Sequence, residues 1–470
     1  MYKASELIDL WAHLKPTDIA FVDEAHEVNY REFDMYTRKI AFQIREKGIK
    51  PGEIVGLILP TYLGWLFTFS LYRLGITVMW QSSLKPFSPE VKPNWLMTIE
   101  PHPGISADRT IIVDESYLDL INSSKELNDL SGYENPSDLA GLFSTSGTTG
   151  DFKYTAHTAE ELSFIATRPG TDDSFGDEGV LSLLTFGAAW STFHALKCLT
   201  FGRTFYACMF TDYRLPKFLT KYPIRTLIGS PVQIATFLDI QKQTGTKLPL
   251  LKTIIMGGSA PSAQLIDRVK GQLDCKLYNS YGSTEAGHVS IYEVQSSEEI
   301  GAWIRPPVEL QIVDDNDNQL PSMSVGNIRY RREGMATSYY KNPEATAQFF
   351  KDGYFYPGDL GFIDHAGRLL LEGRSSEVIN LGGVKVNPER IESIALAQLG
   401  VRDCAAFARI NDSGVEELGI ALVVDGNFDK ENFEKAMASK SPLQIRQARI
   451  VPFIPRNENG KIQRNLLAAE

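Results

Sequence analysis

Short apolar runs alternate with helical patterns along most of this chain, and this alternation constrains the fold more than any other feature. Apolar runs at 54–59, 180–184 and 253–256 read as strands, and a helical pattern covers 32–47. Several of the runs are followed by a loop and then by helix-like spacing. The pattern predicts an α/β fold with largely parallel sheets. Such sheets place their ligands at the carboxyl ends of the strands.

The overall composition narrows the class of protein. The chain has 470 residues, of which 43% are hydrophobic and 22% are charged, so it can form two or three domains with full cores. Its net charge of -11 argues against nucleic-acid binding as the main function. The cysteines lack zinc-ligand spacing, and free thiols in a reducing compartment are the simplest interpretation of these residues: Cys198, Cys208, Cys275 and Cys404.

No targeting signal or membrane span is predicted within the first eighty residues. The first apolar stretch carries Glu6, Asp9 and His13, which makes it a poor signal peptide. The most apolar window, 59–80, contains Arg73 and is interpreted as a core helix rather than a membrane span. We therefore expect a cytoplasmic protein with no membrane span and no nucleic-acid partner.

The texture of the sequence changes near residue 374. A helical stretch at 388–399, a strand at 419–424 and a helix at 430–438 follow. Together they predict a small α+β domain of about ninety residues. The predicted division is a large N-terminal domain at 1–373, a hinge at 374–376 and a small C-terminal domain at 377–470.

A loop dense in small and hydroxylated residues, 144–153, follows the apolar stretch 139–143 and ends in Lys153. Glycines let the backbone approach a ligand closely, and successive N–H groups and hydroxyls can donate to phosphate oxygens. The loop therefore indicates phosphate binding. Taken alone, it could also be a flexible surface loop.

Three more segments follow this loop in order: 278–287, then 356–361 with Gly373 and Arg374, and finally Gly460 and Lys461 with Arg464. Together with the loop, these segments resemble the ordered motifs of the adenylate-forming superfamily. That superfamily includes acyl- and aryl-CoA ligases, peptide-synthetase adenylation domains and beetle luciferases. The resemblance spans nearly the whole chain. It implies a large N-terminal domain that binds ATP and the acid, and a small mobile C-terminal domain.

The resemblance assigns most of an ATP site. A loop that cradles the β- and γ-phosphates, with Lys153 as a mobile cation, would consist of Thr145, Ser146, Gly147, Thr148, Thr149 and Gly150. Tyr281 would stack on adenine and Thr284 would reach the α-phosphate. Glu285 would hold Mg²⁺, which prefers oxygen ligands. Further nucleotide contacts are implied for Gly258, Ser259, Ala260, Gly282 and Ser283.

The remaining ATP contacts lie later in the chain. By resemblance, Asp359 would accept hydrogen bonds from the ribose hydroxyls and Arg374 would assist it. Lys461 would bridge the substrate carboxylate and the α-phosphate, where charge develops. Taken singly, each residue also has an ordinary reading, such as a turn residue for Asp359 or a surface ion pair for Arg374.

The acyl pocket implied by the resemblance draws on Phe186, Gly187, Trp190, Ser230, Gly257, Gly287 and His288. Relatives that activate amino acids usually have Asp at the position of Gly187, where it pairs with the substrate ammonium. Without that partner a buried ammonium is costly. An amine-free acid, fatty or aryl, is therefore expected. Either histidine of this region, His288 or His194, could equally be structural.

The sequence determines the thiol acceptor less well than it determines the ATP site. Gly382 and Gly383 resemble the glycines that line a pantetheine path, with Ser376 at the hinge position, although a tight turn would also explain the glycines. The prediction is an AMP-forming ligase that makes an acyl-adenylate and transfers the acyl group to CoA. Loading of a carrier-protein phosphopantetheine is the close alternative. A non-catalytic nucleotide-binding relative and a luciferase-like oxidation remain open.

Overall fold

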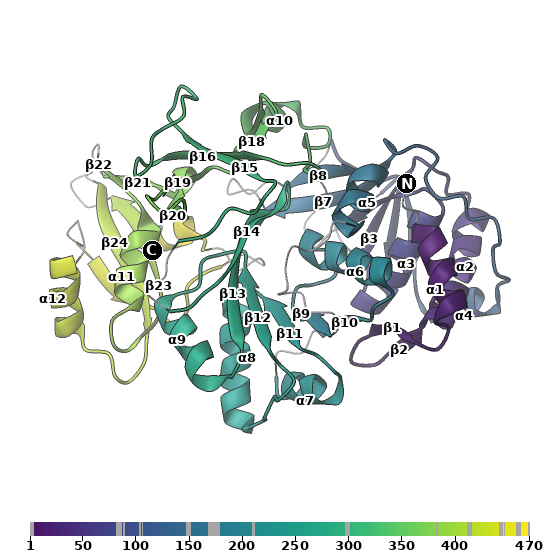
Figure 1. Ribbon diagram of the computed structural model, residues 1–470, viewed down its shortest axis with the longest axis horizontal. Helices are drawn as coiled ribbons and strands as arrows, with labels where there is room; N and C mark the ends of the chain where they lie inside the picture. The colour runs from purple at the N-terminus through teal and green to yellow at the C-terminus, as the bar shows by residue number, and fades with distance from the viewer. Residues whose placement is uncertain are drawn as a thin grey trace. The chain divides into compact units, whose positions relative to one another are not determined.

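The computed structural model describes residues 4–80, 87, 90–102, 105, 107–146, 152–167, 179–208, 212–296, 301–381, 384–410, 416–440, 445, 447–456 and 462–468. These residues form two compact units that are interleaved along the chain. The first unit contains Met1–Gly258, Asp274–His288 and Arg332–Gly353, and the second contains Ser259–Leu273, Val289–Arg331 and Tyr354–Glu470. The helices and strands are labelled in Figure 1.

The first unit contains a six-stranded sheet in the order β6-β5-β3-β4-β7-β8. Its strands are β3 (Ile54–Ile58), β4 (Thr77–Trp80), β5 (Trp95–Thr98), β6 (Arg109–Ile112), β7 (Leu139–Ser146) and β8 (Phe152–Thr158). All neighbours are parallel except β7 and β8, which form an antiparallel hairpin. The helices that precede or connect these strands are α1 (Ala4–Leu14), α2 (Tyr30–Glu46), α3 (Thr61–Arg73) and α4 (Glu115–Ser123).

A second sheet has the order β14-β13-β12-β11-β9-β10-β1-β2. Its strands belong to this unit, except that β14 belongs to the second unit from Val289 onward. It consists of β1 (Ile19–Val22), β2 (Glu27–Asn29), β9 (Val180–Ser182), β10 (Phe205–Ala207), β11 (Thr226–Gly229), β12 (Thr253–Gly257), β13 (Lys276–Ser283) and β14 (Gly287–Glu293). The five contacts from β13 to β1 are parallel, and β2 is antiparallel to β1. The unit also contains α5 (Ala159–Thr167), α6 (Ala189–Phe201), α7 (Arg214–Lys221), α8 (Pro231–Thr244), α10 (Pro343–Phe349) and β17 (Phe350–Lys351).

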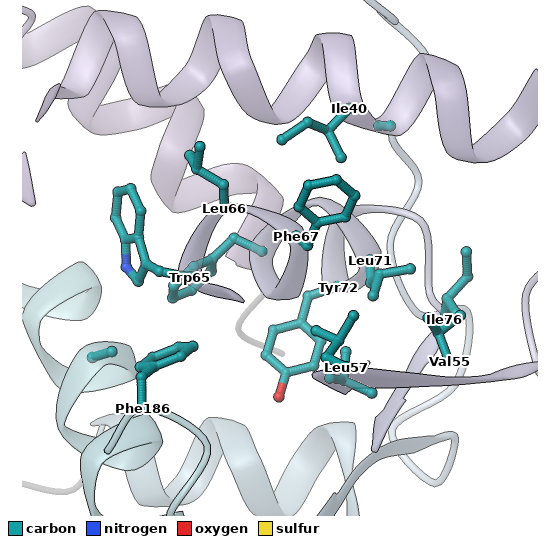
Figure 2. Close-up of a cluster of buried hydrophobic side chains, with 14 of the residues drawn as sticks. Ile40, Val55, Leu57, Trp65, Leu66, Phe67, Leu71, Tyr72, Ile76 and Phe186 are labelled. Carbon is teal, nitrogen blue, oxygen red and sulfur yellow. The ribbon is translucent and has the colours of Figure 1, made fainter. Parts of the chain in front are cut away.

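Helix α3 is buried from Gly64 to Arg73 and lies at the centre of the core of this unit. Figure 2 shows its side chains Trp65, Phe67 and Leu71 between Ile40 of α2 and the β3 side chains. This burial on all sides explains why the window 59–80 is so apolar. The predicted core helix is confirmed over Thr61–Arg73, whereas the end of the window, Thr77–Trp80, is the buried strand β4. Helix α2, by contrast, begins with a capping box and buries only one face.

The second unit is built on an antiparallel sheet, which the alternation pattern did not predict. The strands β18 (Tyr354–Phe355), β16 (Gly326–Arg331), β19 (Asp359–Ile363) and β20 (Leu369–Arg374) lie in that order, and β15 (Glu309–Val313) also pairs with β16. The neighbouring pairs β15–β16, β16–β18, β16–β19 and β19–β20 are all antiparallel. Helix α9 (Ala263–Gln272) belongs to the same unit.

The C-terminal part of this unit has the predicted α+β character. Its elements are the 3₁₀ turn η1 (Ser375–Glu377), β21 (Ile379–Leu381), β22 (Val384–Val386), α11 (Pro388–Leu396), β23 (Val401–Ile410), β24 (Glu416–Val424), α12 (Lys430–Lys440), β25 (Gln447–Ile450) and α13 (Arg464–Ala468). The fold class is therefore confirmed as α/β with a smaller α+β part. The division at 374–376 stays a prediction; the backbone of Ser376 lies in η1.

Candidate active site

The predicted phosphate loop connects the two strands of the β7–β8 hairpin. The register pairs Ser144 with Tyr154 and Thr145 with Lys153, so Lys153 lies near the tip of the hairpin. The strand predicted before the loop is confirmed as β7. The loop residues Gly147, Thr148, Thr149 and Gly150, and the side chain of Ser146, lie outside the described residues.

Lys153 and Glu285, which are far apart in the sequence, are brought together within the first unit. Glu285 follows β13 and is only 6% exposed, and its Oε1 accepts a hydrogen bond of 2.7 Å from Tyr339 Oη. Lys153 Nζ lies 3.9 Å from the ring centroid of Phe349 and 5.5 Å from that of Tyr339. Burial lowers the pKa of Lys153, and the negative charge of Glu285 opposes that shift. Sequence reasoning missed Tyr339 and Phe349, since no local motif marks them.

The segment from Tyr281 to Glu285 follows a path that requires glycine. A Cβ on Gly282 would lie 2.2 Å from the carbonyl oxygen of Gly287, far inside van der Waals contact. Ser283 Oγ accepts a hydrogen bond of 3.2 Å from the Ala286 N–H. The side chains of Tyr281 and Thr284 are half-buried. The described geometry therefore presents Thr284 and Glu285 from one tight turn after β13.

All seven residues of the predicted acyl pocket also lie in this unit. The ring of Trp190 would be 2.6 Å from a Cβ on Gly257, and it meets the His288 ring edge-on at 4.8 Å between centroids. His288 Nδ1 lies 2.6 Å from Ser280 Oγ. Three elements, α6, β12 and β14, thus bring three of the predicted residues together: Trp190, Gly257 and His288.

Phe186 and Gly187 pack against Trp80, which ends β4 in the six-stranded sheet. The rings of Phe186 and Trp80 meet edge-on with centroids 4.9 Å apart, and Figure 2 shows Phe186 beside the core of α3. Gly187 has φ 106°, and a Cβ there would be 2.7 Å from the Trp80 ring. A side chain at this position is therefore disfavoured twice, by conformation and by space. A carboxylate able to pair with an amine has no room here.

Two of the predicted site residues, Ser230 and Gly258, have local features that the sequence did not reveal. Ser230 caps α8 in a capping box with Gln233, so its hydroxyl is engaged with the helix. Gly258 has φ 87°, and a Cβ on it would have no atom within 4 Å. Gly258, Ser259 and Ala260 are exposed. Gly287, at φ 67°, begins β14.

In the second unit, Asp359 and Arg374 face each other across β19 and β20. They are register partners, and Arg374 Nε lies 3.1 Å from Asp359 Oδ1. Asp359 is only 9% exposed. The structure thus pairs Arg374 with Asp359, and the ribose contact of Asp359 stays a prediction. Gly382, Gly383 and Lys461, together with the side chain of Ser376, lie outside the described residues.

The described residues alone provide few ligands for a divalent cation. Within the described ranges, no three His, Cys, Asp or Glu side chains are grouped so as to hold a metal ion. Mg²⁺ commonly takes one or two carboxylates and completes its coordination with phosphates and water. Glu285, a buried carboxylate beside a lysine, fits that arrangement. Separately, none of the described helices is long and apolar enough to cross a membrane.

Comparisons with known proteins agree with this geometry. Residues 96–340 match the family described as AMP-binding enzyme. The chain is 26% identical to enterobactin synthase component E of Escherichia coli over 88% of this chain and 84% of the relative. It is 25% identical to a 4-chlorobenzoate–CoA ligase of Arthrobacter, over 99% and 95% of the two chains. The crystal structure of the anthranilate CoA ligase AuaEII with anthranoyl-AMP superposes with a TM-score of 0.87 at 19% identity, over 100% and 97%.

The family match covers more than half of the chain, so the chain belongs to the AMP-binding enzyme family. Its relatives define the class further: the chain is an AMP-forming acid–thiol ligase, and its relatives include 4-chlorobenzoate–CoA and 2-succinylbenzoate–CoA ligases.

Proposed function

We propose that this chain activates an amine-free aryl carboxylic acid with ATP and transfers the acyl group to CoA. The choice of an aryl acid rests on the position of Trp190. Its ring lies against Gly257 and beside His288, within the predicted acyl pocket. Aromatic rings pack favourably against such a face. A long fatty chain would need the space that the indole fills.

The glycine at position 187 supports the exclusion of amino acids. Its backbone conformation and the Trp80 ring leave no room for an acidic side chain. A substrate ammonium would therefore lose its hydration without gaining a partner, which is costly. The name of one relative, a 4-chlorobenzoate–CoA ligase, is consistent with this choice, because its acid is aromatic and lacks an amine.

The proposed chemistry has two steps. A carboxylate oxygen of the acid attacks the α-phosphorus of ATP, the α–β phosphoanhydride bond breaks, and pyrophosphate leaves with the bond electrons. The thiolate of CoA then attacks the acyl carbon, and AMP leaves. Catalysis of the first step consists mainly of positioning and of stabilising charge on the phosphates.

Each residue role belongs to this proposal. Thr284 donates to the α-phosphate, Lys153 and the loop at 145–150 bind the outer phosphates, and Tyr281 stacks on adenine. Asp359 accepts from the ribose hydroxyls. Glu285 holds Mg²⁺, which when bound neutralises phosphate charge. Lys461 bridges the carboxylate and the α-phosphate.

The test is pyrophosphate and AMP release against matched benzoic, fatty and α-amino acids, each with and without CoA. The proposal predicts release that depends on aryl acids and rises with CoA. Trp190→Ala should shift the ratio of kcat/KM values toward bulkier aryl acids, whereas the matched control Trp303→Ala, a tryptophan 53% exposed in the second unit, should not. Preference of the unaltered protein for fatty acids would overturn the aryl assignment.

A carrier-protein phosphopantetheine is the second acceptor to be tested. Aryl-adenylate formation that ignores CoA but is consumed by a phosphopantetheinylated carrier protein would favour it. We place the reaction in the cytoplasm, which is consistent with the four free cysteines.

A further inference from the structure

Glu285 and Lys153 carry opposite charges and lie close together, yet among the described residues no ion pair joins them. Instead, the Tyr339 hydroxyl donates to Glu285 Oε1 at 2.7 Å, and the Lys153 ammonium lies over the rings of Phe349 and Tyr339 at 3.9 and 5.5 Å. The two rings meet edge-on, with centroids 6.0 Å apart and planes at 88°. The aromatic pair thus contacts both charged groups.

The backbone holds Tyr339 in a fixed position relative to both charges. Tyr339 forms an isolated antiparallel β-bridge with Thr155 on β8, and Thr155 lies two residues after Lys153. The Tyr340 N–H donates to Tyr154 O at 2.8 Å, on the same strand. On the other side, the Ala336 N–H donates to Glu285 O at 2.7 Å. One short segment, 336–340, therefore ties the lysine strand to the glutamate turn.

Phe349 is held by the helix that follows. The Tyr339 N–H donates to Thr346 Oγ1 at 3.0 Å, and the Thr346 hydroxyl donates to Asn342 O at 2.7 Å. These bonds fix α10, which ends at Phe349. The ring faces of a phenylalanine attract a cation without neutralising it, because the attraction comes from the ring quadrupole. A lysine held in this way keeps its full charge for a phosphate.

We propose that Tyr339 and Phe349 form an aromatic dock that keeps Lys153 from pairing with Glu285 and orients the Glu285 carboxylate toward a divalent cation. This inference rests on the proposed function, in which Glu285 holds the cation and Lys153 meets the outer phosphates. Tyr339 is then a positioning residue. Groups that orient a metal ligand in this way typically change metal affinity by roughly 10- to 100-fold when removed.

The first experiment measures Mn²⁺ binding by the loss of the free-ion electron paramagnetic resonance signal, counted beyond the loss that the α,β-methylene analogue of ATP causes without protein. Tyr339→Phe keeps the ring but removes the donor, so Glu285 can turn toward Lys153. We expect Mn²⁺ affinity to fall about tenfold. The matched control is Tyr340→Phe, because the neighbouring tyrosine packs against a different core cluster. It should bind Mn²⁺ as the unaltered protein does.

A second readout follows Lys153 itself. Acetylation by limiting acetic anhydride, measured by peptide mass spectrometry, should be faster at Lys153 in Phe349→Leu. Mn²⁺ affinity should fall less than in Tyr339→Phe, because the Tyr339 hydroxyl still holds Glu285. Phe349→Tyr retains an aromatic face and should restore the slow rate. A role of Phe349 in folding alone would not separate these two measurements.

The outcomes separate a failure of the aromatic dock from a failure of the proposed function. If the unaltered protein binds Mn²⁺ with the analogue and exchanges pyrophosphate with an acid, but Tyr339→Phe binds Mn²⁺ equally well, the dock is refuted and the function stands. The same holds if Tyr340→Phe loses as much affinity. If the unaltered protein does neither, the proposed function and the dock both fail.

Discussion

Gly282 gives the sharpest test of how tightly the turn before Glu285 is built. In Gly282→Ala, the added Cβ would lie 2.2 Å from the Gly287 carbonyl oxygen. Carbon and oxygen that are not bonded rarely approach closer than about 3.2 Å, so one of the two strands must move by about 1 Å. The obstacle is backbone, which cannot rotate away as a side chain could. Thr284 and Glu285 follow directly in the chain and move with it.

A displacement of about 1 Å in a positioned catalytic group can cost about 100-fold in rate, which is about 2.7 kcal/mol. The assay is acid-dependent exchange of labelled pyrophosphate into ATP, with the melting temperature measured in parallel. Gly271→Ala is the matched control, since Gly271 lies in α9 with nothing within 4 Å of the new methyl group. Exchange in Gly282→Ala at the rate of the unaltered protein would refute the reasoning.

Three further changes test the core, the pH response and the nucleotide site. Asp34→Asn removes a partner of the fully buried Arg73, at 2.7 Å, and should lower the free energy of unfolding by about 3 kcal/mol in urea titrations; an unchanged midpoint would contradict this. Burial lowers the pKa of His157 from 6.5 to about 4, so the unfolded state binds a proton that the folded state does not. Stability should therefore be complete above pH 6.5 and fall by up to about 3 kcal/mol toward pH 4, and His157→Phe should flatten that slope. Asp359→Asn, which weakens the charge-assisted pair with Arg374, should raise the KM for ATP about tenfold or more without a matching loss in melting temperature; an unchanged KM would remove Asp359 from the nucleotide site.

Much of the large-scale fold follows from local patterns. The strand runs at 54–59 and 253–256 became β3 and β12, and the helical pattern at 32–47 became α2. Each is a segment whose periodicity is set by burial on one or both faces. The antiparallel sheet of the second unit was missed, because strands such as β16 and β19 are short and half-exposed, and they mix charged residues among apolar ones.

The site was predicted less completely, for a physical reason. Glu285 and Asp359 could be proposed as site residues because they lie in motifs of recognisable order. Tyr339 and Phe349 could not, since their roles arise from contacts across more than fifty residues of sequence. The crowding at Gly257 is likewise a tertiary property. It depends on where α6 places Trp190.

The most direct test of the central claim uses a benzoic acid labelled with oxygen-18 in its carboxylate, incubated with the protein, ATP, Mg²⁺ and CoA. Attack by the carboxylate on the α-phosphorus, followed by thiol attack on the acyl carbon, leaves one labelled oxygen in AMP. We predict AMP that carries the label together with unlabelled pyrophosphate and an aryl-CoA thioester. Label in inorganic phosphate with formation of ADP, or thioester formed with unlabelled AMP, would contradict the account.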